Sequence, residues 1–78
     1  MKMVIFDATI KAQFLKELDI IERGGREITV LAVHRDDNRR DVGIAFQNLE
    51  GGIQGAAIPF DVDVLLGTEL DVPDDLFD

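Results

Sequence analysis

The residue types that carry most enzyme chemistry are scarce in this chain. Its 78 residues contain no Cys, Ser, Tyr or Trp, three Thr and a single His. The absence of Cys excludes disulfides, thiolate nucleophiles and Cys-based zinc sites, and one His cannot form a paired-His zinc motif. A nucleophile activated by His34 would have only a threonine hydroxyl available. The sequence therefore predicts a protein that is not an enzyme and that uses no metal or cofactor.

Carboxylates are the remaining groups with possible chemistry, and Asp61 and Asp63 are the most suggestive pair. On a strand these two side chains would point the same way, and hard divalent cations prefer carboxylate oxygens. Two exposed carboxylates make a weak site without further ligands. A metal-dependent nuclease or phosphatase would therefore require Asp7 to converge with both of them.

Asp7 stands directly after an apolar run, in the segment VIFDATI. This segment resembles the start of haloacid-dehalogenase-type phosphotransferases, which read strand and then Asp-x-Asp-x-Thr. The second Asp of that pattern is absent here, and that family needs a chain about twice as long or more. We therefore expect Asp7 or Thr9 to cap a helix.

The segment around His34 contains the only cluster of basic residues. Three arginines there could grip a phosphate or carboxylate and are secondary candidates for partner contact: Arg35, Arg39 and Arg40. Three aspartates between positions 36 and 41 interleave with them, which predicts a self-balanced turn. We expect His34 to form a surface ion pair with Asp41, and the glycines at positions 51, 52 and 55 to form a hairpin connection.

The N-terminal half predicts a strand followed by one main helix. Residues 2–6 are apolar enough for a short buried strand. The next apolar residues recur at helical spacing and form one stripe, which ends at a Gly-Gly pair typical of a helix C-terminus: Ile10, Phe14, Leu18 and Ile21, before Gly24 and Gly25.

A hairpin centred on Gly24 and Gly25 is the alternative for the same residues. Its two-residue turn would place Glu22 opposite Glu27 and Arg23 opposite Arg26. Like-charged cross-strand pairs are unfavourable. We therefore favour the helix.

Three further segments have strand patterns. Residues 28–34 are apolar on both faces, which is typical of a central strand, and residues 42–47 alternate. If His34 lies opposite Asp41, one bulky face gathers Leu31, Val33, Val42, Ile44 and Phe46. Residues 56–66 alternate most clearly, although Pro59 places that strand at an edge or breaks it, and a short helix from Asp61 to Gly67 is the alternative.

These elements predict a small α+β domain with the order β-α-β-β-β and a mostly antiparallel sheet. Residues 1–67 form the expected core domain and residues 68–78 an acidic C-terminal tail. Seven apolar side chains are expected to be buried together: Ile10, Phe14, Leu18, Leu31, Val33, Ile44 and Phe46. One helix covers only one face of the strand 28–34, so we expect a homodimer to cover the other.

Charge is distributed very unevenly along the chain. All eight basic residues lie in positions 1–40 with seven acids, whereas positions 41–78 hold nine acids and no base. The net charge of −8 argues against direct binding to nucleic acid. The acidic end instead predicts a polyanionic surface for a basic partner, carried by Asp61, Asp63, Glu69, Asp71, Asp74 and Asp75. Leu76 and Phe77 would add apolar anchoring to it.

The last eight residues, DVPDDLFD, resemble two docking peptides of DNA replication. One is the acidic tail of bacterial single-stranded-DNA-binding proteins, but Asp78 follows Phe77 here, so the terminal aromatic carboxylate is absent. The other is the sliding-clamp-binding peptide, which places a Gln before Leu-Phe, and that Gln is missing. A tail that folds back, with Leu76 and Phe77 on the sheet, is the alternative.

Together these features predict a non-enzymatic acidic protein-binding module. It would be an inhibitor or adaptor that docks on a basic, nucleic-acid-binding protein surface, and its composition is similar to that of virus-encoded inhibitors that imitate nucleic acid. The alternative is a homodimeric structural or regulatory module whose acidity serves only solubility. The longest apolar stretches are far below the about 20 residues of a membrane span, so we expect a cytoplasmic location in a bacterium or a virus-infected cell.

Overall fold

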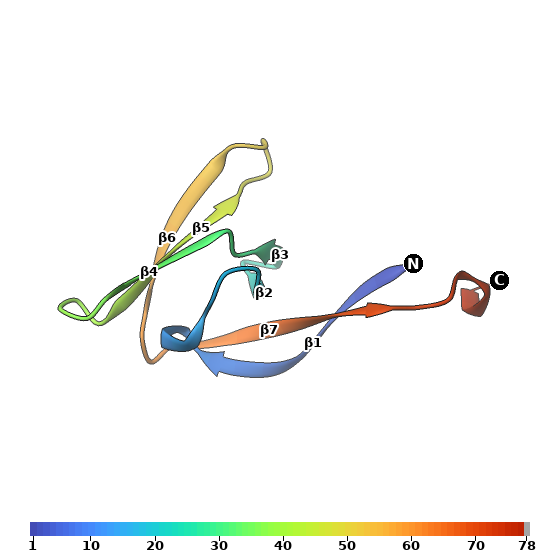
Figure 1. The fold of residues 1–78 in the computed structure, drawn as a ribbon, viewed down its shortest axis with the longest axis horizontal. Coiled ribbons are helices and arrows are strands. Elements are labelled where there is room, and N and C mark those ends of the chain that lie inside the picture. The colour runs from blue at the N-terminus through green and yellow to red at the C-terminus, as the bar shows by residue number, and fades with distance from the viewer. Residues whose placement is uncertain (78) are drawn as a thin grey trace.

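Two antiparallel β-sheets make up the protein (Figure 1). The computed structural model describes the backbone of residues 1–77 and the side chains of residues 1–75. The larger sheet has the strand order β1-β7-β2-β3 and the smaller sheet β4-β5-β6. The elements are β1 (Lys2–Lys11), the 3₁₀ turn η1 (Ala12–Phe14), β2 (Ile20–Arg23), β3 (Arg26–Thr29), β4 (Ala32–Asp36), β5 (Asp41–Gln47), β6 (Ile53–Pro59), β7 (Asp63–Asp71) and the 3₁₀ turn η2 (Asp74–Phe77).

The expected α+β class is wrong, because the described part of the chain contains no α-helix. Residues 2–11 form one long strand, which pairs with β7 from Lys2 opposite Asp71 to Lys11 opposite Asp63. An isolated helix of about 15 residues is marginal in water, so this ladder outweighs the helical spacing of the apolar residues. Two residues of the expected stripe, Phe14 and Leu18, are accordingly exposed.

The hairpin that we rejected is the structure that forms. β2 and β3 pair with Glu22 opposite Glu27 and Arg23 opposite Arg26. Gly24 and Gly25 have φ values of 60° and 79°, which suit a two-residue turn of type I′, and the Glu22 carboxylate accepts a 2.7 Å hydrogen bond from the Gly25 amide. Like-charged pairs cost up to about 1 kcal/mol each. Burial of one isoleucine contributes about 1.5–3 kcal/mol, and this hairpin buries two.

The expected strand 28–34 is two strands in two sheets. β3 ends at Thr29 and β4 begins at Ala32, with the fully buried Val30 between them. The Val30 amide donates to the Asp19 carbonyl at 2.8 Å, and the Leu31 amide donates to the Ala45 carbonyl at 2.7 Å. The chain therefore changes partner strands within two residues, while every amide there still finds an acceptor.

The pairing of β4 with β5 is shifted by two residues from the expected register. His34 lies opposite Gly43, and Asp36 lies opposite Asp41. The shift follows from the tight turn after β4, in which the Asp36 carboxylate accepts from the Asn38 and Arg39 amides at 3.1 Å each. A shift of two preserves which residues share a face. The buried faces of Val42, Ile44 and Phe46 are therefore confirmed.

The clear alternation over residues 56–66 spans two strands and a turn. β6 ends at Pro59 and is an edge strand, which confirms the consequence expected of that proline. Residues 60–62 turn, and β7 begins at Asp63, so the helix alternative from Asp61 to Gly67 is wrong. Residues 68–71, which we assigned to the acidic tail, form the last part of β7 and pair with β1.

The core lies where the two sheets face each other. It gathers eleven buried apolar residues: Ala12, Leu15, Ile21, Ile28, Val30, Val42, Ile44, Phe46, Ile58, Phe60 and Val64. Of the seven side chains expected in the core, Ile44 and Phe46 are buried, and Ile10 and Val33 pack at its margin. Phe14 and Leu18 are exposed because the helix that was to carry them does not form. Leu31 is also exposed, because it lies in the connection between β3 and β4 and not on a strand of the expected sheet.

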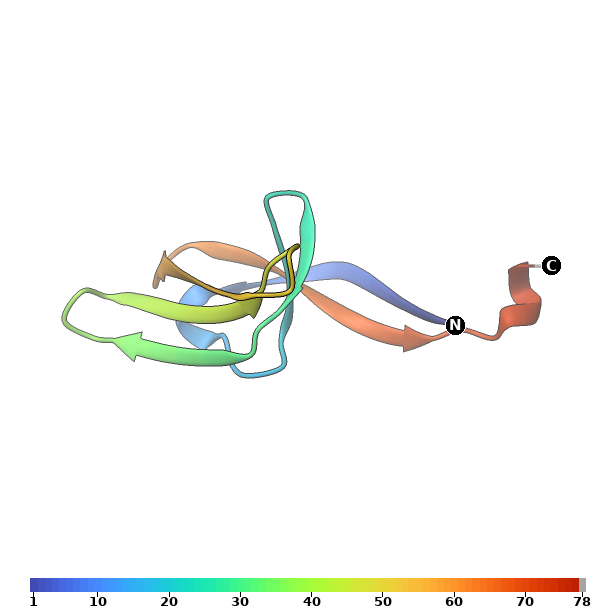
Figure 2. The same cartoon turned by 90° about the horizontal axis from the view of Figure 1, so that it is seen from above.

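Part of the larger sheet projects beyond this core as a two-stranded ribbon (Figures 1 and 2). We call it the arm; it comprises residues 2–6 of β1 and residues 67–71 of β7, which pair with each other. The molecule measures 52 × 28 × 19 Å, and its radius of gyration is 14.1 Å. A compact chain of this length would have a radius of gyration of about 11.5 Å. The arm therefore accounts for the elongated shape.

Two phenylalanines test the placement of the core. Phe46 is 4% exposed and Phe14 is 63% exposed, although the sequence predicts both as core residues. We expect Phe46→Ala to lower the free energy of unfolding by about 3–5 kcal/mol and Phe14→Ala to lower it by less than about 0.5 kcal/mol. Urea melts of the two variants measure both values. Equal losses would contradict this core.

The like-charged pairs of the hairpin predict a stabilising substitution. Glu27→Lys places a cation opposite Glu22, so we expect the free energy of unfolding to rise by about 0.2–1 kcal/mol. Glu27→Gln removes the repulsion without adding an attraction and should give a smaller gain. Urea melts at low and high salt distinguish the two, because salt should diminish the gain. A loss of stability in Glu27→Lys would show that the hairpin pairs differently.

Candidate functional site: the carboxylates along β7

The carboxylates predicted to bind a partner follow one path along the molecule. Asp63, Glu69 and Asp71 alternate on β7 and point to the same face of the sheet. Asp61 lies in the turn before β7, and Asp74 and Asp75 begin η2 at the far end. All six are exposed. β7 runs from the body to the tip of the arm (Figure 1), so the acidic path follows the long axis.

Half of these carboxylates are paired with cations of the N-terminal segment. Asp63 lies 2.8 Å from the Lys11 ammonium, Glu69 lies 3.1 Å from the Lys2 ammonium, and Asp74 lies 2.9 Å from the N-terminal amine. The other three, Asp61, Asp71 and Asp75, have no ion pair within the part of the chain that the structure describes. The net negative field of the path therefore comes mainly from these three residues.

The carboxylates that share a strand face are not the expected pair Asp61 and Asp63. We expected Asp61 and Asp63 to lie on one strand at the spacing of alternate residues, but Asp61 belongs to a turn. Glu69 and Asp71 are the pair on one strand face, at about 6.6–6.8 Å along the strand. Leu65 and Gly67 separate them from Asp63 on the same face. The path is thus two acidic clusters joined by an apolar stretch, and not an even row.

The Lys11 side chain ties the turn to β1. Its ammonium contacts the Asp63 carboxylate and also donates to the Asp61 carbonyl oxygen at 3.3 Å. The hydrogen bond with Asp63, together with the negative charge of that group, raises the pKa of Lys11 above its ordinary value. The side chains are exposed, so we attribute to this contact local order at the start of β7 and little global stability.

The last two residues of the predicted partner set are only partly described. Leu76 and Phe77 belong to η2, but their side chains lie outside the described part of the chain, as does Asp78. The expected contact of Leu76 and Phe77 with a partner or with the sheet stays a prediction.

The three arginines of the secondary candidate site lie around the β4–β5 turn. Arg35 lies 3.9 Å from Asp37 and Arg39 lies 4.0 Å from Asp36, so both face carboxylates of the same turn. Arg35 and Arg40 also lie over the ring of Phe60, at 5.1 and 5.8 Å from its centroid, within cation–π range. The sequence pattern missed this role of Phe60, because Phe60 is 20 residues or more away in the chain. The cluster fastens the turn to the core.

Asp7 does not converge with Asp63, as a metal-dependent nuclease or phosphatase would require. Asp7 sits at a bulge in β1, and Lys11, four residues further on, lies opposite Asp63. Four strand residues span about 13 Å, which is too far for shared coordination. Among the described residues, no three His or acidic side chains could hold a metal ion. His34 lies opposite Gly43 and not opposite Asp41.

Three further features of the described residues are a surface hollow, the glycine-rich hairpin connection and the length of the helical turns. A hollow of about 310 Å³ lies between the β2–β3 turn and β7, and its lining includes Glu22, Asp63 and Arg23. The glycine-rich segment is a hairpin connection, as expected, in which the Asn48 side chain accepts from the Glu50 and Gly52 amides. No helix of the described chain is long and apolar enough to cross a membrane.

The Lys11–Asp63 contact predicts that a substitution of Asp63 changes the pKa of Lys11. Asp63→Asn removes the carboxylate that raises the Lys11 pKa, so we expect that pKa to fall toward its ordinary value. Because the folded-state pKa is raised, the contact contributes stability below the ordinary lysine pKa and loses it as the pH rises through the folded value. Titration of the Lys11 ε-carbon by NMR measures the change, with Lys16 as the internal reference. An unchanged Lys11 pKa would contradict the contact.

Comparison with known proteins adds no relative. No protein-family model matches the chain, and no curated protein or solved structure matches it. The charges, the exposure and the topology of the chain itself are therefore the only indications of its function. Of these, the acidic path along β7 is the feature with the clearest consequence for a partner.

Proposed function

We propose that this protein is a non-enzymatic binding module that docks on a basic protein surface through the acidic path of β7 and η2. The observation that carries the proposal is the placement of Asp61, Asp71 and Asp75. They are exposed, unpaired among the described residues and distributed along the long axis. A surface of this shape matches an extended basic groove better than a compact basic patch.

The kind of partner follows from the charge pattern. Basic grooves that hold nucleic acid are lined with lysine and arginine and carry counterions, which a fixed acidic surface displaces on docking. Glu69 and Asp71 have a spacing close to that of successive phosphates on a nucleic acid strand. The proposal is therefore an inhibitor or adaptor of a nucleic-acid-binding protein, acting in the cytoplasm where such complexes are accessible. Arg35, Arg39 and Arg40 are engaged within their own turn, so the proposal assigns them no partner contact.

The second candidate function is a homodimeric structural module whose acidity serves only solubility. The observation that favours it is the set of ion pairs along β7, which neutralise Asp63, Glu69 and Asp74. A surface that only binds a basic protein would bind it more tightly if these three carboxylates had no ion pair within their own chain. The two functions differ in whether the position of the charge matters or only its amount.

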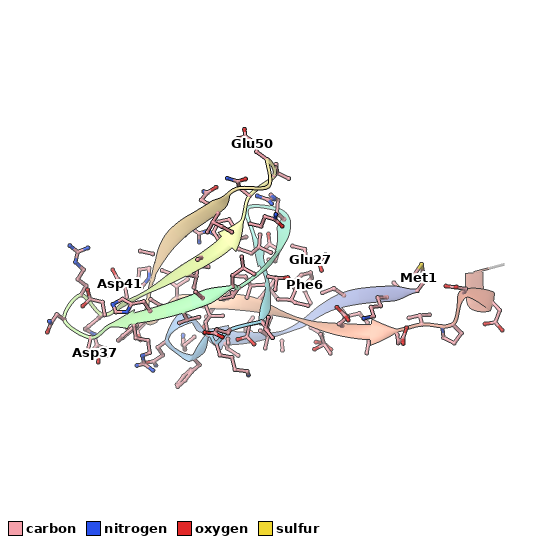
Figure 3. All side chains as sticks on the ribbon, turned by 45° about the horizontal axis from the view of Figure 1, so that its top comes forward. Met1, Phe6, Glu27, Asp37, Asp41 and Glu50 are labelled. Atoms are coloured by element: carbon pink, nitrogen blue, oxygen red, sulfur yellow. The ribbon has the colours of Figure 1, made fainter. Side chains whose placement is uncertain are left out.

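A pair of triple variants separates the two. Asp61→Asn, Asp71→Asn and Asp75→Asn together remove three charges from the acidic path. Glu27→Gln, Asp37→Asn and Glu50→Gln remove three charges from the body, where all three side chains are exposed (Figure 3). We expect the first variant to lose most of the binding to a basic partner and the second to keep it, because docking depends on charge position.

The measurement uses immobilised protein and a nucleic-acid-depleted lysate of the source cell. Captured proteins are eluted with a DNA duplex and identified, and their binding is then measured at increasing salt. Docking in a nucleic-acid groove predicts release by the duplex and affinity that falls steeply with salt. Equal losses in the two triple variants would assign the effect to total charge, and capture that DNA does not displace would contradict nucleic-acid mimicry.

A further inference from the structure

The two edges of the arm have opposite characters. β1 is the outer strand of its sheet, and the ladder between β7 and β2 involves only Leu66 and Gly67 of β7. Beyond Gly67 the arm is therefore a ribbon of two strands, with unpaired backbone groups on both sides. An isolated two-stranded ribbon is marginally stable at best in water, so a third strand would stabilise it.

The backbone groups that face outward on β1 can be assigned from the chain ends. Met1 and Val72 exchange two hydrogen bonds, of 2.9 Å and 2.7 Å. Hydrogen-bonded and non-hydrogen-bonded pairs alternate along an antiparallel ladder, and the pairing is regular up to Phe6. The N–H and C=O groups of Met3 and Ile5 therefore point toward β7. Those of Lys2, Val4 and Phe6 point outward.

Side chains on both faces of the arm are apolar and incompletely covered. On the face continuous with the core, Met3, Ile5 and Leu70 are 39%, 41% and 41% exposed. On the other face, Val4 and Phe6 pack across Gly67, where an added Cβ would lie 2.6 Å from Val4 Cγ1; Phe6 stands at the root of the arm in Figure 3. A strand added at the β1 edge would cover apolar groups on both faces.

Other free edges in the described chain carry features that oppose pairing. Charged side chains, proline and short length all protect an edge. β3 has four residues, two of them charged, β4 carries Arg35 and Asp36, and β6 contains Pro59. Residues 3–6 of β1, in contrast, are four consecutive apolar residues, and the bulge at Asp7 ends the regular stretch. The open segment is thus limited to residues 2–6.

We propose that this segment pairs with the same segment of a second copy, in an antiparallel register centred on Val4. A two-fold axis through that point makes three hydrogen-bonded pairs from the outward-facing residues: Val4 with Val4, and Lys2 with Phe6 in both directions. Met3 then lies opposite Ile5 on the other face. The two copies form one four-stranded sheet in the order β7-β1-β1-β7.

The charges select a second copy at β1 and exclude it at β7. In the Val4-centred register no charged residue lies opposite a like charge, and Lys2 lies opposite an aromatic ring, which is a favourable partner for a cation. The outward groups of β7 belong to Gly67, Glu69 and Asp71. Self-pairing there would place Glu69 opposite itself or opposite Asp71, which is destabilising.

Five residues per copy are a small interface, so we expect association in the micromolar to millimolar range.

The inference is independent of the proposed function, because it uses the opposite edge of the arm. A second copy would leave β7 and its carboxylates at the two outer edges of the joined sheet. Loss of partner binding in the acidic-path variant would therefore leave the dimer intact, and loss of the dimer would leave the acidic path exposed.

A single introduced cysteine tests the register directly, because the chain has no cysteine of its own. Directly opposed residues in a hydrogen-bonded pair have Cα atoms about 5.5 Å apart, within the range of a disulfide. We expect Val4→Cys to form a covalent dimer under mild oxidation. Glu69→Cys is the matched control, since Glu69 lies beside Val4 but on the opposite edge, and it should cross-link much more slowly. Equal rates would overturn the proposal.

Charge exchange at the same position gives a second, non-covalent test. Wild-type protein should sediment as a concentration-dependent dimer of twice the 8.7 kDa chain mass. Val4→Lys and Val4→Glu should each be monomeric, because the register opposes each new charge to itself, and their equimolar mixture should recover the dimer. Amide NMR spectra establish that each variant is folded. A wild type that stays monomeric at millimolar concentration, or a Val4→Lys variant that associates like the wild type, would overturn the proposal.

Discussion

The antiparallel ladder between β1 and β7 holds the larger sheet together. It joins the two ends of the chain over almost the whole length of both strands, and β7 also carries the hairpin β2–β3 through Ile20 and Ile21. Without β7 the larger sheet would have no central strand. The contact spans almost the entire sequence, so its closure entropy must be overcome before its hydrogen bonds and side-chain contacts are gained.

The same ladder redistributes the charge of the chain. Every basic residue lies in positions 1–40, and the acidic excess lies after them. β1 carries Lys2 and Lys11 to the carboxylates of β7, and the N-terminal amine reaches Asp74. A strongly polarised sequence thus becomes a surface in which half of the acidic path is neutralised. Such exposed ion pairs stabilise the fold little, but they determine which carboxylates of the path keep an uncompensated negative charge.

The arm follows from the unequal lengths of the strands in that sheet. β2 and β3 have four residues each, whereas β1 and β7 have ten and nine. The long strands therefore extend beyond the short hairpin and leave two free edges. The outward backbone groups belong to Lys2, Val4 and Phe6 on β1 and to Gly67, Glu69 and Asp71 on β7. The first edge is therefore mostly apolar with one cation, and the second edge is acidic. The arm therefore exposes two edges of different chemistry on a ribbon of two strands.

Local features that need no distant partner can be predicted from the sequence. The alternation at Val42, Ile44 and Phe46, the edge position imposed by Pro59 and the hairpin connection near Gly51 all follow from the pattern of a few neighbouring residues. The acidic end of the chain and the scarcity of catalytic residue types are likewise properties of composition. These features direct the proposed site to the acidic end of the chain, and that placement stays a prediction.

The choice between helix and strand for residues 7–23 depends on strands that are distant in the sequence. Their apolar residues fit a helical stripe, but β7, more than 50 residues away, offers β1 a ladder that a lone helix cannot match. The like-charged pairs of the β2–β3 hairpin made this pairing look unfavourable in the sequence. The hairpin forms nevertheless, because repulsion between exposed charges is weak and the buried contact of Ile21 with Ile28 is strong. The sequence also could not show which carboxylates are left without an ion pair. The cations that neutralise Asp63, Glu69 and Asp74 come from the other end of the chain and reach them only when β1 pairs with β7.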